Sequence, residues 1–299
     1  MRIRFAIFEA IKKDFWSFER AFPNWRNFDV LQGEFAWSPL SMPVTALAQN
    51  FCGCYGILYA GLSHLSKALR YVQASELPYI EYTITEQLKK AKPEFNDSRS
   101  NQVANSLALK WEEMATFFSA SFLSNMRIDI PKLLQHCHLN LHFSSYYLEH
   151  YAFFCNCIVY QIHEWRRSVK DDLCIVVLLS EAQAAGLITK NDFVQPLFNK
   201  FYLLGREAGM SIWTEAQQLS EIANTIKAEC SKIFCGGFGM GRDAAEICNA
   251  MALRGKDEEE MTRFLTGALK TRPEMQLIID RQRGATPVIV DRCLIAKEM

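Results

Sequence analysis

The chain has 299 residues, of which 49% are hydrophobic and 22% are charged, and its 33 basic residues balance its 33 acidic residues. This composition is typical of a globular protein and argues against disorder. The length suffices for a sizeable core in one large domain or two moderate ones. A net charge of zero excludes a general electrostatic attraction to nucleic acid, but it leaves room for a local basic patch.

The first residues lack the basic, apolar and small-residue segments of a secretion signal, so we expect a cytoplasmic protein. Its ten cysteines are then expected to be thiols rather than disulfides. Residues 35–66 contain no charged residue, and this uncharged stretch is long enough to span a bilayer. Pro39, Pro43 and His64 interrupt this run, and no Lys/Arg cluster flanks it. We therefore expect a buried helix there rather than a membrane span.

In chain order, an apolar run at 5–8 predicts a strand, which is followed by a loop with two prolines and a long apolar helix from about 44 to 72. Between 100 and 122 the apolar residues recur every three or four positions, which predicts an amphipathic helix capped by Ser100. The alternating segment 138–143 predicts a strand, and helical spacing returns over 147–165.

The segment LCIVVLL at 173–179 is apolar without alternation, which predicts a strand buried on both faces of a parallel sheet. Strands and helices then alternate, with a helix near 192–208 ended by Gly209, a strand at 210–216, a helix at 220–229 and a strand at 232–238. Asp243 and Asp257 each precede a glutamate by three residues, which predicts capping boxes for two more helices. The segment MQLIIDRQRGATPVIVDR near the end predicts two strands joined by a turn at Gly284.

Helices thus cluster in the first half of the chain and βα units in the second. This order predicts an α/β sheet that is interrupted by a mostly helical insertion. We expect residues 1–40 and 130–299 to form the α/β core and residues 41–129 to form the insertion.

No segment of the sequence matches Gly-x-x-x-x-Gly-Lys-Ser/Thr, the loop that holds the phosphates in P-loop hydrolases. GGFGMG at 236–241 lacks the lysine and the hydroxyl, and we interpret it as a strand-to-helix turn, although a phosphate at the helix start is physically allowed. Ser180 and Glu181 leave the carboxyl end of a buried strand, where ligands bind in open α/β sheets. Glu181 is either a general base that orients water or a solvated carboxylate.

The cysteine and histidine pairs do not predict a metal site. Residues two apart on a helix point about 200° apart, so neither Cys52 with Cys54 nor Cys155 with Cys157 can close on one ion. Two histidines at 138 and 142 would share a strand face but lie roughly 13 Å apart. We expect no structural metal.

The order of these segments resembles that of the HerA/FtsK-like ATPases, the hexameric DNA-pumping group that includes the coupling ATPases of type IV secretion. FEAIKKDF is similar to the family's Asp-x-Lys-x-Asp-like motif, and WSPL at 37–40 stands in place of Asn-Pro-Leu. LLSEAQ resembles a Walker B strand, and GREAGMSIWTEAQQLS resembles an Arg-x-x-Gly turn with a sensor strand. IKAECSKIF and RDAAEICNAMA complete a match that covers nearly the whole chain.

This resemblance implies an α/β fold with a RecA-like P-loop NTPase-type sheet, incomplete because the Walker A strand and helix are missing. It implies that Glu181 polarises the attacking water, that Gln217 senses the γ-phosphate and that Arg206 couples neighbouring sites. It also implies ATP and Mg²⁺ as cofactors, held with help from Ser180, Glu9 and Lys12.

Two departures from the family pattern leave two hypotheses. Ser180 stands where the family has the aspartate of the magnesium shell, and the P-loop is absent. Either the chain is the C-terminal part of a DNA-translocating or secretion-coupled ATPase that needs a P-loop half, or it is a non-catalytic subunit derived from such an ATPase. The first hypothesis expects an open apolar sheet edge beside the first strand, and the second expects the chain's own residues to cover that edge.

Both hypotheses imply a homo- or hetero-oligomeric ring that contains the P-loop half or an active ATPase paralogue. The remaining partners implied by the resemblance are DNA, bound without sequence specificity, and membrane-associated secretion machinery. The basic clusters at 166–170 and 281–283 are either phosphate contacts or solvated turns.

Overall fold

The structure is a computed structural model that describes residues 2–10, 13–57, 59–78, 80–90, 98–123, 129–145, 147–180, 201, 204–215, 230–235, 241–250, 253–268, 275–280 and 284–289. Contacts divide the chain into two compact units, Met1–Ala216 and Gln217–Met299.

The first unit contains a five-stranded sheet in the order β2-β3-β1-β4-β5. All four pairings are parallel, and the strands are β1 (Arg2–Glu9), β2 (Trp25–Asp29), β3 (His138–His142), β4 (Leu173–Leu179) and β5 (Met210–Thr214). The apolar run of β4 is mostly buried, as the sequence predicted. The mixed segment of β2 gave no strand signal, because its middle residues are polar or partly exposed.

The position of β1 corrects one expectation. The prediction of an open sheet edge beside the first strand was wrong, because β1 pairs with β3 on one side and with β4 on the other. The edge strands of this sheet are β2 and β5.

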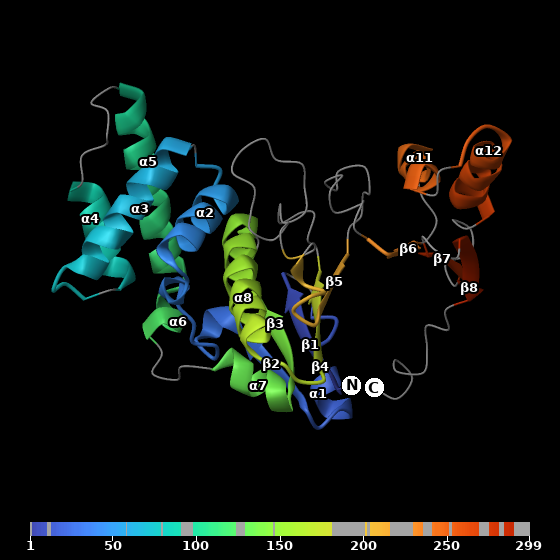
Figure 1. Cartoon of the computed structure of the whole chain (residues 1–299), viewed down its shortest axis with the longest axis horizontal. Helices are drawn as coiled ribbons and strands as arrows, with labels where there is room; N and C mark the ends of the chain where they lie inside the picture. Colours follow the sequence, from blue (N-terminus) through green and yellow to red (C-terminus); the bar gives the residue numbers. More distant parts are fainter. Residues whose placement is uncertain are drawn as a thin grey trace. The chain divides into compact units, whose positions relative to one another are not determined.

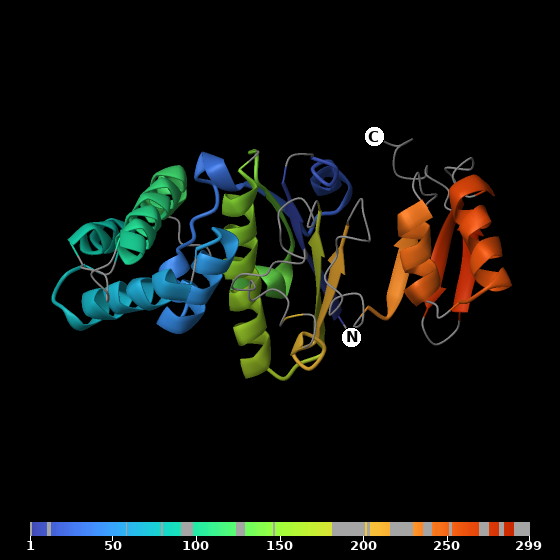
Figure 2. The ribbon, with the colours of Figure 1, turned by 90° about the horizontal axis from the view of Figure 1, so that it is seen from above.

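Helices α1 (Phe18–Ala21) and α7 (Ile130–His136) border the strands, and α8 (Leu148–Ser168) runs along the sheet (Figure 1). Five further described helices of this unit lie between β2 and β3 in the sequence: α2 (Val44–Cys54), α3 (Tyr59–Ala74), α4 (Glu81–Lys90), α5 (Ser98–Phe117) and α6 (Ser119–Leu123). Seen from above, α8 separates the sheet from α2–α5 (Figure 2).

The long helix expected from 44 to 72 is two helices. The chain leaves α2 through Gly56, whose φ of 62° is in the left-handed region that glycine adopts most readily. The helix expected at 100–122 begins at Ser98 and ends at Phe117, and α6 follows it. Among the described helices, none has both the length and the apolar character needed to cross a bilayer.

Aromatic side chains join α8 to the sheet and to the segment that precedes the insertion. The Phe154 ring on α8 lies 6.2 Å from the Phe8 ring on β1 and 5.0 Å from the Trp37 ring. It also meets the rings of Phe35 and Phe143, and it is completely buried. Phe154 therefore connects three parts of the core.

We expect Phe154→Ala to lower the free energy of unfolding by about 3–5 kcal/mol, because it leaves a cavity among these rings. Urea denaturation followed by circular dichroism measures this change. Tyr82→Ala is the control, because Tyr82 is 69% exposed and its removal should cost about 0.5 kcal/mol or less. Equal losses for both variants would contradict this account of the core.

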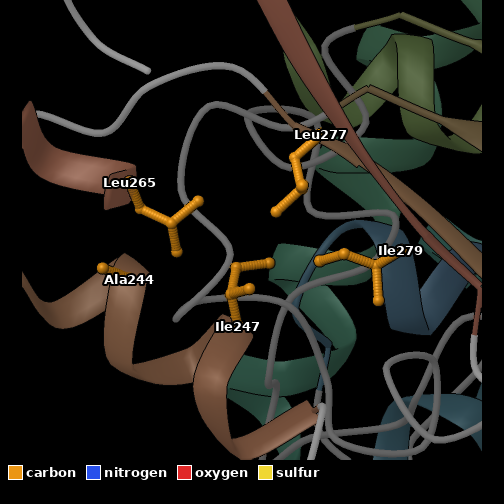
Figure 3. Close-up of a cluster of buried hydrophobic side chains, with 5 residues drawn as sticks. All are labelled: Ala244, Ile247, Leu265, Leu277 and Ile279. Atoms are coloured by element: carbon orange, nitrogen blue, oxygen red, sulfur yellow. The ribbon is translucent and has the colours of Figure 1, made fainter. Parts of the chain in front are cut away.

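The second unit has a three-stranded antiparallel sheet in the order β6-β7-β8, made of β6 (Lys232–Cys235), β7 (Met275–Asp280) and β8 (Gly284–Ile289). Side chains from β7, from α11 (Gly241–Ala250) and from the π-helical turn η4 (Phe264–Ala268) form its core (Figure 3). The strands predicted on either side of Gly284 are confirmed, with Gly284 as the first residue of β8.

Neither predicted N-cap aspartate is the residue that precedes its helix. Asp243 lies inside the first turn of α11, which begins at Gly241. Helix α12 (Lys256–Arg263) has Gly255 at its N-cap and no side-chain cap, so Asp257 is also a first-turn residue. Both aspartates are still placed favourably toward the positive end of a helix. The helices predicted near 192–208 and 220–229 lie mostly or wholly outside the described residues.

Candidate functional site

One polar residue stands at the carboxyl end of each of the five parallel strands. Asp29, His142 and Glu9 are the last residues of β2, β3 and β1, and Ser180 and Glu215 directly follow β4 and β5. Asp29 and Glu9 are both paired in register with His142.

Two backbone hydrogen bonds extend this register across the other strands. The Ser180 N–H donates to the Phe8 carbonyl at 3.0 Å, which places Ser180 level with Glu9. The Glu215 N–H donates to the Leu179 carbonyl at 3.0 Å, which places Glu215 level with Ser180.

Residues level with each other in parallel strands point to the same face of the sheet. The five residues therefore form one line on the face opposite Phe8 and α8. We call Asp29, His142, Glu9, Ser180 and Glu215, in this order, the polar row.

Glu9 lies at the centre of the row and is only 1% exposed. Its Oε1 accepts a hydrogen bond from the Phe15 N–H at 2.9 Å, and its Oε2 accepts one from Asn140 Nδ2 at 2.7 Å. Burial raises the pKa of Glu9, and these two hydrogen bonds oppose the shift only in part. Both carboxylate oxygens are thus engaged within the protein.

The first two members of the row also bond within the protein. The Ser144 hydroxyl donates to Asp29 Oδ2 at 2.6 Å and lies 2.9 Å from His142 Nδ1. The Lys13 ammonium lies 3.9 Å from Asp29 Oδ2. Because the hydroxyl proton of Ser144 is directed at a carboxylate, the imidazole does not activate this serine as a nucleophile.

The other end of the row is open to solvent. Ser180 is partly exposed and Glu215 is exposed. Behind them the buried Tyr151 hydroxyl on α8 lies 2.9 Å from the Phe8 carbonyl and 3.1 Å from the Ser180 carbonyl. Tyr151 thus fixes the ends of β1 and β4. Within the described ranges, no three His, Cys, Asp or Glu residues are grouped to hold a metal.

The structure brings two of the predicted site residues together, since Ser180 and Glu9 are neighbours in the polar row. Arg206 is exposed in the turn before β5, at the amino end of the strands. The length of β5 separates it from the row by roughly 15 Å or more. Glu181, Gln217 and Lys12 lie outside the described residues.

An ion pair between buried Arg166 and the more exposed Asp171 holds the turn that carries Arg206. Arg166 is 4% exposed, its Nη1 lies 2.7 Å from Asp171 Oδ1, and its Nε donates to the Ala208 carbonyl at 3.4 Å. The hydrogen bond from Arg166 lowers the pKa of Asp171. Arg166 is therefore not available to a DNA phosphate, which reduces the basic cluster at 166–170 to two exposed cations.

Three members of the row were not predicted from the sequence, namely Asp29, His142 and Glu215. Their common feature is a polar residue at the end of a strand. That feature identifies a row only after the strand order and register are known, because the five residues are spread from position 9 to position 215.

We expect Tyr151→Phe to lower the free energy of unfolding by about 1 kcal/mol, because it removes one buried hydrogen-bond donor and leaves the ring in place. Amide exchange at Ser180 should also become faster. Urea denaturation and hydrogen exchange measure the two effects, with exposed Tyr147→Phe as the control. Wild-type exchange at Ser180 in Tyr151→Phe would contradict the role of this hydroxyl.

No protein-family model matches the sequence, and no curated protein matches it. Among solved structures, the chain is similar to the plasmid coupling protein TrwB in complex with ADP and Mg²⁺, with a TM-score of 0.71 and 9% identity over 99% of this chain and 80% of that one. It is also similar to VirB4 of Thermoanaerobacter pseudethanolicus, with a TM-score of 0.70 and 12% identity over 99% of this chain and 83% of that one.

These likenesses extend over almost the whole chain at very low sequence identity, so they establish the fold. The five-stranded parallel sheet with its accompanying helices is that of the RecA-like P-loop ATPases TrwB and VirB4. The RecA-like α/β fold implied by the resemblance to the HerA/FtsK-like ATPases is thereby confirmed, and the absence of a Walker A strand and helix from this fold stays a prediction.

Proposed function

We propose that this chain supplies the Walker B and sensor part of a HerA/FtsK-like ATPase of the DNA-translocating or secretion-coupled type. In this proposal it hydrolyses ATP only when a P-loop strand from outside these 299 residues pairs with β5. The observation that carries the proposal is that β5 pairs with one strand only among the described residues, so that its unpaired side lies next to the open end of the polar row.

Backbone directions support β5 as the docking edge. The Ile175 N–H bonds to the Gly209 carbonyl, and the Glu215 N–H bonds to the Leu179 carbonyl. Odd-numbered residues of β5 therefore direct their backbone groups toward β4, and Ile212 directs its N–H and C=O away from it. In the part of the chain that the structure describes, β5 has one strand neighbour. Such an edge is a template for a further strand.

The missing chemistry defines what must dock there. ATP hydrolysis needs a cradle of backbone N–H groups and a lysine around the phosphates, and the sequence contains no Gly-x-x-x-x-Gly-Lys-Ser/Thr loop. A parallel strand beside β5 would end at the same edge as Ser180 and Glu215. A P-loop that follows such a strand would therefore lie next to the open end of the row.

The proposed roles follow from position. Glu181 follows Ser180 directly and orients the attacking water, and Gln217, two residues after Glu215, contacts the γ-phosphate. Glu9 ends β1 on the other side of Ser180, and Lys12 follows Glu9 by three residues in the sequence. Magnesium, when bound with ATP, supplies charge neutralisation of the phosphates.

Arg206 has a different role in this proposal. It lies at the amino end of β5, too far from the polar row of its own chain for direct contact. In an oligomeric ring it would instead reach the nucleotide of a neighbouring subunit, which couples the sites.

The second candidate function is a non-catalytic subunit of such a ring, and the Ser180 hydroxyl in place of an aspartate favours it. A neutral hydroxyl replaces only part of the charge that a magnesium shell needs. A DNA partner in the ring would be contacted through phosphates and without sequence choice.

A fusion tests the proposal directly. A strand–P-loop–helix segment of a P-loop ATPase is joined through a flexible linker to the amino end of the chain. We expect magnesium-dependent ATP hydrolysis by the fusion and none by the chain alone. Glu181→Gln in the fusion should abolish hydrolysis and preserve nucleotide binding, because the water is no longer activated. Nucleotide binding without hydrolysis in the unmutated fusion would favour the non-catalytic subunit.

The docking edge is tested in the same fusion. Ile212→Pro removes an N–H that points away from β4, so the sheet should stay folded while nucleotide binding falls. Trp213→Pro is the matched control, because it removes an N–H that points toward β4 and should unfold the strand. Unchanged nucleotide binding in Ile212→Pro would show that the P-loop strand does not pair with β5.

A further inference from the structure

Glu215 lies directly beside Ser180 at the open end of the polar row, on the strand next to β4. Neighbouring strands are about 4.8 Å apart, and the two side chains point to the same face. Oxygen ligands of one magnesium ion lie about 3 Å apart when each is 2.0–2.1 Å from the metal. A serine hydroxyl and the longer glutamate side chain on adjacent strands can therefore converge on one ion.

The chemistry of this pair fits magnesium. Magnesium prefers oxygen ligands and is bound in phosphate-transferring sites by one or two carboxylates together with phosphates and water. The Ser180 hydroxyl is neutral, and the Glu215 carboxylate carries the single negative charge that an aspartate at position 180 would have supplied.

The other carboxylates of the row are not available for this purpose. Glu9 accepts hydrogen bonds at both of its oxygens and is buried. Asp29 accepts from the Leu31 N–H through Oδ1 and from the Ser144 hydroxyl through Oδ2. Glu215 is the exposed carboxylate of the row in the described part of the chain.

We propose that Glu215 and Ser180 together bind the magnesium ion, so that the carboxylate missing from the end of β4 is supplied from the end of β5. This inference rests on the proposed function for the identity of the ion and its nucleotide. It concerns Glu215, which lies outside the Walker B segment and is distinct from the sensor glutamine. The substitution at position 180 then relocates the charge of the metal site and does not remove it.

The test uses Tb³⁺ as the probe, a hard cation that prefers oxygen ligands and luminesces when a nearby indole is excited. Trp213 lies two residues before Glu215 on β5, on the same face, and is 50% exposed. The difference between wild type and Trp213→Phe gives the luminescence that Trp213 sensitises. This signal should saturate with Tb³⁺ and decrease when Mg²⁺ competes.

Two substitutions in the polar row test how Glu215 and Ser180 each contribute to Tb³⁺ affinity. We expect Glu215→Gln to weaken Tb³⁺ binding by about tenfold, a factor that corresponds to about 1.4 kcal/mol. Ser180→Asp should strengthen it and should restore binding in the double variant with Glu215→Gln. The matched control is Glu207→Gln. It removes an exposed carboxylate that precedes β5, at the amino end of the strands, and should leave Tb³⁺ binding unchanged.

Equal Tb³⁺ affinity in Glu215→Gln and Glu207→Gln would overturn the proposal, and so would a double variant that Ser180→Asp fails to restore. Both measurements use the chain alone and need no P-loop. A metal site that depends on Glu215 in a chain whose fusion binds no nucleotide would contradict the proposed ATPase and leave this inference standing. A fusion that hydrolyses ATP, but in which Glu215→Gln changes neither Tb³⁺ nor Mg²⁺ affinity, would support the proposed ATPase and contradict this inference.

Discussion

The parallel register of the five strands is the constraint on which the rest of the first unit depends. Because every strand runs in the same direction, every strand ends at the same edge, and one polar residue from each end enters a single row. Buried backbone pairing fixes this register, since a shift by one residue would exchange the two faces of a strand. The row therefore follows from strand pairing and requires no dedicated loop to assemble it.

The two ends of the row differ in their environment. At the ends of β2 and β1 the carboxylates of Asp29 and Glu9 accept hydrogen bonds from Ser144, Asn140 and the Phe15 backbone, which stabilise these buried polar groups. Near β4 and β5 the row faces solvent, and Tyr151 supports it from behind. The closed end thus serves the fold, and the open end offers oxygen ligands where β5 lacks a second strand neighbour among the described residues.

The sequence predicted the elements whose pattern is strong and local. The continuous apolar run of β4, the alternation of β3 and the helical spacing of α8 all indicated the correct structure. β2 was missed because an edge strand carries polar residues on its exposed positions, and the break at Gly56 was missed because one glycine interrupts an otherwise apolar stretch. Ser180 and Glu9 were predicted from motif order, whereas Glu215 became visible only with the register, because a row across a sheet is not contiguous in sequence.

The central claim is that β5 is an open edge ready to pair with a strand from outside these residues. Residue-specific amide hydrogen exchange of the chain, measured by NMR, tests it most directly. The account predicts an alternating pattern on β5, with fast exchange at Ile212 and Thr214 and slow exchange at Ser211, Trp213 and Glu215, whose N–H groups point toward β4. Slow exchange at all five residues would show that the edge is already covered and would contradict the claim.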